Sequence, residues 1–226
     1  MLKNNWRVYK DIDELSDQLA CDILNVAEKS IKSNSDFKIV LAGGTSFINT
    51  YRILSKSKSD WSKWHIYLGD ERCLQLKDKN RNDYVINRVW LSNGLIPKEN
   101  INFIPAELGV EKAVLKYKDT LKNVLSFDLV LLSMGEDGHT ASLFPGRIYN
   151  EKRSVIVEKD SPKYPKNRIS MSYSRLNKSK YVFKVVCGNS KQFAFESWVK
   201  GVALPINKIS GNNEKVFICR DVFCIK

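Results

Sequence analysis

Short apolar segments that alternate with helical patterns constrain the fold of this chain more than any other feature. Phe37–Leu41 and Phe127–Leu132 are short apolar runs typical of buried strands, whereas Asp11–Lys32 repeats apolar side chains at near-helical spacing. Other strand-like segments are Trp64–Leu68, Ser154–Glu158, Arg168–Met171, Tyr181–Cys187 and Lys215–Arg220, and other helical patterns are a stretch ending at Leu54, Asn80–Ser92, Glu111–Asn123 and Gln192–Lys200. This alternation predicts an α/β fold with a mainly parallel, Rossmann-like open sheet and helices on both faces.

The size and composition are those of an ordinary globular protein. A length of 226 residues is sufficient for one hydrophobic core, so we expect a single domain spanning residues 1–226. No apolar run approaches the roughly 20 residues of a membrane span, so we expect no membrane partner. The N-terminal residues lack the apolar core of a signal peptide, and the five cysteines form no C-x-x-C pair. These features predict a cytoplasmic protein with reduced thiols.

The formal net charge of +12 is open to two interpretations, because a positive field attracts either an anionic substrate or nucleic acid. The lysines are dispersed and there is no dense arginine block or RNA-binding motif, so we expect no nucleic-acid partner. Only two histidines occur, His65 and His139, without the spacing of a zinc site. We therefore expect neither a metal nor a cofactor, and we expect His65 to pack in the core.

The segment from Ser133 to Gly146 carries the clearest chemical information. It follows the strand-like run at Phe127–Leu132, and Gly135 and Gly138 allow the chain to turn sharply there. His139 is therefore expected on a loop at the edge of the sheet, where α/β folds bind ligands and where an imidazole can exchange a proton near neutral pH. The alternative is a turn histidine that only bonds a nearby carbonyl.

Two glycines and two hydroxyl residues follow the strand-like run at Phe37–Leu41. Gly43, Gly44 and Thr45 separate this run from a helical pattern, an order that suits an anion cradle. Glycine allows backbone N–H groups to approach a phosphate, and the helix N-terminus adds its dipole. The alternative is a simple turn in which Thr45 or Ser46 caps the helix.

Charged side chains follow the strand-like run at Trp64–Leu68. Asp70 can orient a histidine or a water molecule, and Arg72 can bind a phosphate or carboxylate through two parallel hydrogen bonds. The alternative is a surface turn in which these charges pair with one another. Because Gly43–Thr45, Gly69–Arg72, Gly135–His139 and Gly188–Lys191 all follow strands, we expect them to meet at one edge of a parallel sheet.

The string SMGEDGHTASLFPG, from Ser133 to Gly146, resembles the G-x-x-D-G-H-T-A-S-L-F-P-G signature of the 6-phosphogluconolactonase family. Further matches to family motifs, in the same order, are Gly43-Gly44-Thr45, Gly69-Asp70-Glu71-Arg72, Arg168-Ile169-Ser170 and the Gly188 and Lys191 of G-x-x-K. The resemblance covers nearly the whole chain. It implies hydrolysis of 6-phospho-D-glucono-1,5-lactone to 6-phospho-D-gluconate, the second step of the oxidative pentose phosphate pathway.

The resemblance also implies roles for individual residues. His139 is the expected general base, acting on water without a metal, and Asp70 steadies it or relays its proton. The residues expected to bind the phosphorylated sugar lactone are Gly43, Gly44, Thr45, Arg72, Asn82, Gly138, Arg168 and Lys191. We expect a monomer or a weak homo-oligomer.

Several alternatives stay open at this stage. Glucosamine-6-phosphate deaminases share a G-x-D-G-H loop, but the continuation Thr140–Pro145 favours a lactonase, and a non-catalytic sugar-phosphate binding protein is a third possibility. The carboxylate that partners His139 is Asp70, Glu71 or Asp137. Arg81 stands where the family usually has serine, and it either contacts the phosphate or points into water.

Overall fold

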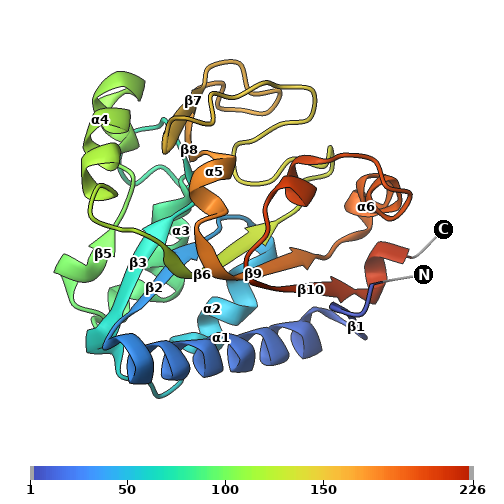
Figure 1. The fold of residues 1–226 in the computed structure, drawn as a ribbon, viewed down its shortest axis with the longest axis horizontal. Coiled ribbons are helices and arrows are strands. Elements are labelled where there is room, and N and C mark those ends of the chain that lie inside the picture. The colour runs from blue at the N-terminus through green and yellow to red at the C-terminus, as the bar shows by residue number, and fades with distance from the viewer. Residues whose placement is uncertain (1–2, 224–226) are drawn as a thin grey trace.

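The computed structural model describes residues 3–223 and has a seven-stranded parallel sheet at its centre (Figure 1). The strand order is β1-β10-β9-β6-β2-β3-β5, and every neighbouring pair is parallel. The strands are β1 (Trp6–Tyr9), β2 (Phe37–Leu41), β3 (Trp64–Leu68), β5 (Ile101–Asn102), β6 (Phe127–Ser133), β9 (Ser179–Val186) and β10 (Asn213–Cys219). The predicted α/β fold with a mainly parallel sheet is confirmed.

Helices cover the sheet on both faces, as predicted. They are α1 (Ile12–Asn34), α2 (Ile48–Leu54), α3 (Asn82–Val89), α4 (Val110–Thr120), α5 (Tyr173–Leu176) and α6 (Gln192–Val199). In Figure 1, α1 runs along one side of the sheet, while α4 and α5 lie beyond the other. The carboxylate of Asp11 accepts the N–H groups of Asp13 and Glu14, which begins α1, and its apolar side chains are buried. No helix among residues 3–223 has the length and apolar character needed to cross a membrane.

A second sheet lies on one side of the first and was not predicted. Its order is β4 (Asp70–Arg72), β8 (Arg168–Met171) and β7 (Val155–Glu158), and both pairs are antiparallel. The sequence predicts strands near the last two segments, but it predicts Asp70–Arg72 only as charged residues that follow the Trp64–Leu68 strand, with a surface turn as the alternative. Instead, the chain leaves β3 at Gly69 and pairs directly with β8. This pairing brings two distant parts of the sequence to the same edge of the central sheet.

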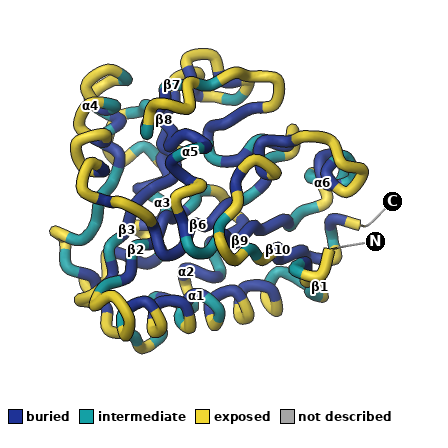
Figure 2. The backbone as a smooth tube through the Cα atoms, viewed as in Figure 1, coloured by how far each residue is buried: buried dark blue, intermediate teal, exposed yellow. Residues whose placement is uncertain are grey.

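The core lies between the sheets and helices, and the exposed parts are mainly outer loops and helix faces (Figure 2). Phe37 and Trp64 pack edge to face on neighbouring strands, with ring centroids 4.7 Å apart. His65, expected in the core, is only half-buried on β3, and this burial lowers the pKa of its imidazole. The edge strands β1 and β5 were not predicted.

Candidate active site

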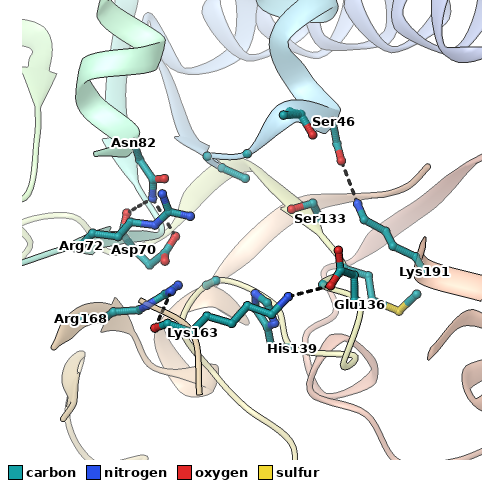
Figure 3. A pocket seen from close by; sticks show the side chains of 17 residues that line it. Ser46, Asp70, Arg72, Asn82, Ser133, Glu136, His139, Lys163, Arg168 and Lys191 are labelled. Carbon is teal, nitrogen blue, oxygen red and sulfur yellow. Dashed lines mark hydrogen bonds and ion pairs between the residues drawn. The ribbon is translucent and has the colours of Figure 1, made fainter. Parts of the chain in front are cut away.

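A pocket of about 180 Å³ lies where the parallel strands β2, β3, β6 and β9 end (Figure 3). It is lined by every residue that the sequence marks for catalysis or substrate binding, with the exception of Gly138: Gly43, Gly44, Thr45, Asp70, Arg72, Asn82, His139, Arg168 and Lys191. Gly138 (φ 82°) instead packs against Leu204, since a Cβ there would lie 2.8 Å from the Leu204 side chain. The topology therefore brings these motifs together, as the strand-end argument requires.

His139 is held in a tight loop immediately after β6. The Gly135 N–H donates to the His139 carbonyl at 2.8 Å, and the Gly138 N–H donates to the Gly135 carbonyl at 3.0 Å. A Cβ on Gly135 would lie 2.1 Å from Cε1 of His139, so the imidazole lies directly against this glycine. The glycine is needed because any side chain there would displace the ring.

The carboxylate that partners His139 is Asp137. Its Oδ1 forms a short hydrogen bond with Nδ1 of His139 and also accepts the His139 backbone N–H at 3.2 Å. Burial alone would raise the pKa of Asp137, but the hydrogen bond and charge of His139 outweigh it and lower the pKa to about 2. An ionised Asp137 keeps the proton on Nδ1, so we assign the neutral ring the tautomer with a lone pair on Nε2.

Asp70 and Glu71, the other two candidates, have different partners. Asp70 Oδ2 accepts from the Ser142 hydroxyl at 2.6 Å, and Asp70 Oδ1 accepts from Nδ2 of Asn82 at 3.2 Å. The Glu71 carboxylate is completely buried and accepts the backbone N–H groups of Arg72, Asn82 and Asp83, each at 2.8 Å. Glu71 thus secures the start of α3, outside the pocket lining.

Three cations of the pocket lack an acidic partner. Arg72 and Arg168 are directly opposite each other in the β4–β8 register, which places both side chains on one face. Lys191 donates to the Ser46 hydroxyl at 2.9 Å. Within the described residues, none of the three forms a salt bridge with a carboxylate. Cations that line one pocket and form no salt bridge favour binding of an anion there.

Backbone carbonyls hold one of these guanidinium groups in place. Nε of Arg168 donates to the Pro165 carbonyl at 3.2 Å, and Nη2 donates to the carbonyls of Lys163 and Tyr164 at 3.2 and 3.1 Å. Burial is the main cause that lowers the pKa of Arg168; the charge of Asp70 acts in the opposite direction, and Arg72 adds a smaller lowering. These contacts fix the geometry of Arg168 without neutralising its charge, so the charge remains available to a ligand.

The glycine turn after β2, Gly43–Thr45, also lines the pocket. Gly44 (φ 89°) precedes the short 3-10 helix Thr45–Phe47, and no side chain caps this helix, which does not support the capping alternative for Thr45 or Ser46. A Cβ on Gly43 would lie 1.9 Å from Oδ1 of Asn82, so this backbone must approach the amide closely. The first N–H groups of a helix have no partner within it and can bind an anion.

Some pocket residues were not predicted. Glu136 and Lys163 both line the pocket and form an ion pair of 3.2 Å. Ser46 and Ser133 also line it. The position of Glu136 inside the histidine motif is a signal that could have indicated it, whereas Lys163 reaches the pocket only because its loop folds back onto the His139 loop.

Both alternatives for Arg81 are wrong. Its side chain is 1% exposed and does not line the pocket, so it neither contacts a phosphate there nor points into water. Nε and Nη2 donate to Asp83 at 2.9 and 2.5 Å, and Nη1 donates to Glu107 at 3.1 Å. Arg81 therefore joins α3 to the segment before α4 through a buried ion-pair network.

Comparison with known proteins agrees with this geometry. The family model described as glucosamine-6-phosphate isomerases/6-phosphogluconolactonase matches residues 10–218. The chain belongs to this family. Within it, the chain is 33% identical to 6-phosphogluconolactonase 3, chloroplastic, of Arabidopsis thaliana, over 92% of this chain and 71% of that protein. It is 32% identical to the 6-phosphogluconolactonase of Thermotoga maritima, over 84% of this chain and 87% of that protein.

Solved structures of other proteins share the fold of this chain. The crystal structure of the 6-phosphogluconolactonase from Thermotoga maritima matches with a TM-score of 0.89 and 29% identity, covering 95% of this chain and 99% of that one. A monomeric glucosamine-6-phosphate deaminase matches with a TM-score of 0.81 at 20% identity, covering 97% and 98%. Because the fold is common to both activities, the site residues have to distinguish between them.

Proposed function

We propose that this chain hydrolyses 6-phospho-D-glucono-1,5-lactone to 6-phospho-D-gluconate, as in the oxidative pentose phosphate pathway. The observation that carries the proposal is His139, paired with Asp137, in one pocket with three cations that form no salt bridge. The proposal is also supported by the names of the relatives and by the continuation Thr140–Pro145 of the histidine motif.

The proposed reaction begins with proton transfer from water to Nε2 of His139, while the water oxygen attacks C1 of the lactone. A tetrahedral oxyanion forms at C1 and is stabilised by nearby donors of the pocket. The bond between C1 and the ring oxygen then breaks, and that oxygen takes up the proton from His139 and becomes a hydroxyl group. Asp137 stabilises the imidazolium that forms between these two transfers. No step requires a metal ion.

The phosphate is bound by the cations and the glycine turn. Arg72, Arg168 and Lys191 supply the charge, and the N–H groups after Gly43 and Gly44 supply further donors. The phosphate takes no part in the bond changes. Its binding orients the lactone and presents C1 to the base.

Acid release from freshly prepared 6-phosphogluconolactone, corrected for spontaneous opening, tests the proposal. We expect His139→Asn to lower kcat by about 10²–10⁴, the usual contribution of a general base, without loss of folding. Glucosamine 6-phosphate should not be turned over. Release of ammonia from that substrate without lactone hydrolysis would instead indicate a deaminase, and phosphate-ester binding without any turnover would indicate a binding protein.

A further inference from the structure

The carboxylate of Asp70 ties together the segments that form the pocket. Asp70 is 7% exposed, and both of its oxygens accept hydrogen bonds, one from the Ser142 hydroxyl at 2.6 Å and the other from the Asn82 amide at 3.2 Å. The same amide donates to the Asp70 carbonyl at 2.9 Å. Figure 3 shows Asn82, Asp70 and Arg72 grouped together, with His139 in another part of the pocket.

Each of these residues belongs to a different functional segment. Ser142 is completely buried and lies three residues after His139 on the loop that holds the base. Asp70 lies two residues before Arg72 on β4. Asn82 begins α3, and its amide lies directly against Gly43 of the glycine turn. Two hydrogen bonds to one carboxylate therefore connect the base, an arginine and the glycine turn.

The contacts do not support a direct effect of Asp70 on the base. Nδ1 of His139 already bonds Asp137, and both carboxylate oxygens of Asp70 are occupied by Ser142 and Asn82. A buried carboxylate with neutral donors on both oxygens is held by those donors and in turn holds them in place. The role that remains for Asp70 is to fix the relative positions of its neighbours.

We propose that Ser142 is a positioning residue, which holds the His139 loop in register with Arg72 and the glycine turn through its hydrogen bond to Asp70. This inference rests on the proposed function, and it gives Asp70 a positioning role as well. The consequence is kinetic, because misplacement of a base by about 1 Å can cost about 10² in rate. Loss of the hydroxyl also leaves Oδ2 of Asp70 without its donor, which allows the loop to shift.

The first test compares two buried serines. Ser142→Ala is expected to lower kcat on the lactone by about ten- to a hundredfold. KM should change by less than about threefold, since the cations that bind the phosphate are untouched. Ser179→Ala is the matched control, because the buried Ser179 hydroxyl also donates one hydrogen bond, to the Leu176 carbonyl at 2.9 Å. Ser179 is the first residue of β9, so it lies at the end of the strand away from the pocket. Equal kcat values for the two variants would overturn the proposal.

The second test asks whether Ser142 acts through Asp70. Asp70→Asn keeps the shape of the side chain, and we expect the double variant to be no slower than the slower single variant, because both changes break one connection. If the two effects multiply, the residues act independently and the proposal fails. The acid limb of the kcat–pH profile should stay in place in Asp70→Asn and move in Asp137→Asn. Movement in both would assign Asp70 a direct effect on His139.

A third measurement does not depend on turnover. Backbone hydrogen exchange of residues 139–143 should be faster in Ser142→Ala than in wild type, and unchanged in Ser179→Ala. An inactive wild type with this exchange pattern would refute the lactonase function while retaining the positioning role. An active wild type whose loop exchanges equally in both variants would refute the positioning role alone.

Discussion

Replacing Asp137 with asparagine removes the charge next to the proposed base and leaves the shape of the side chain intact. In the proposed mechanism, the ionised carboxylate holds the proton on Nδ1 of His139 and stabilises the imidazolium that forms during the reaction. Asparagine has no charge, and its amide can turn its NH₂ group towards the ring. The neutral ring then carries its proton on Nε2, where the base needs a lone pair.

The structure gives a lower bound for the loss. The pKa of Asp137 falls from 3.8 to about 2, and at 1.36 kcal/mol per pKa unit this corresponds to about 2 kcal/mol. The side chain is 34% exposed, so solvent screening reduces the interaction to about 1 kcal/mol, or roughly fivefold in rate. A change of tautomer costs up to about 10⁴. We expect the kcat of Asp137→Asn to be about 10²–10⁴ lower, with little change in KM.

The assay is acid release from the lactone between pH 5 and pH 9, with thermal unfolding measured in parallel. Asp119→Asn is the matched control, because Asp119 also forms an ion pair, with Lys122 at 2.8 Å, but its side chain is exposed on α4. This control should retain wild-type kcat. A folded Asp137→Asn variant with kcat within about threefold of wild type would refute the role assigned to Asp137, since screened electrostatics alone predict a larger loss.

Three further predictions follow from buried or unpaired charges. Lys191→Met should raise KM for the lactone by about ten- to a hundredfold, since a charged hydrogen bond contributes about 1.5–3 kcal/mol. An unchanged KM would show that Lys191 does not bind the phosphate. Arg81→Ser leaves two carboxylates without their cation and should lower the free energy of unfolding in urea by about 3–5 kcal/mol with KM unaffected, whereas wild-type stability would contradict the buried network. The depressed pKa of Asp137 means that its stabilising contribution is present above pH 3.8 and is lost as the pH falls towards about 2. The urea midpoint of the wild type should therefore fall across that interval, and it should depend less on pH in Asp137→Asn. The same pH dependence in both proteins would contradict this.

The sequence predicted the parts of the fold that depend on local pattern. Segments such as Phe127–Leu132 are apolar and short, and the chain can only bury them as strands of a covered sheet. Parallel strands then bring their carboxyl ends to one edge, so the convergence of Gly43, Arg72, His139 and Lys191 follows from topology. These are the features that the structure confirms.

The features that the sequence did not predict depend on pairing and tertiary contact. Strands β7 and β8 have strand-like sequences, but nothing in them specifies an antiparallel partner, and β5 has only two residues and no pattern. Arg81 gave two wrong alternatives because its burial depends on tertiary contact: one partner, Asp83, is two residues away, but the other, Glu107, is 26 residues away. The choice among the three carboxylates near His139 likewise required the geometry of the loop.

The most direct measurement of the central claim, that base and anion site share one pocket, compares two substrates. We predict that kcat/KM for 6-phospho-D-glucono-1,5-lactone exceeds that for the same lactone without phosphate by about 10²–10⁴, which corresponds to two charge-assisted hydrogen bonds of about 1.5–3 kcal/mol each. The advantage should shrink in Lys191→Met. Equal kcat/KM values for the two lactones would contradict the account, because the cations would then have no part in presenting the substrate to His139.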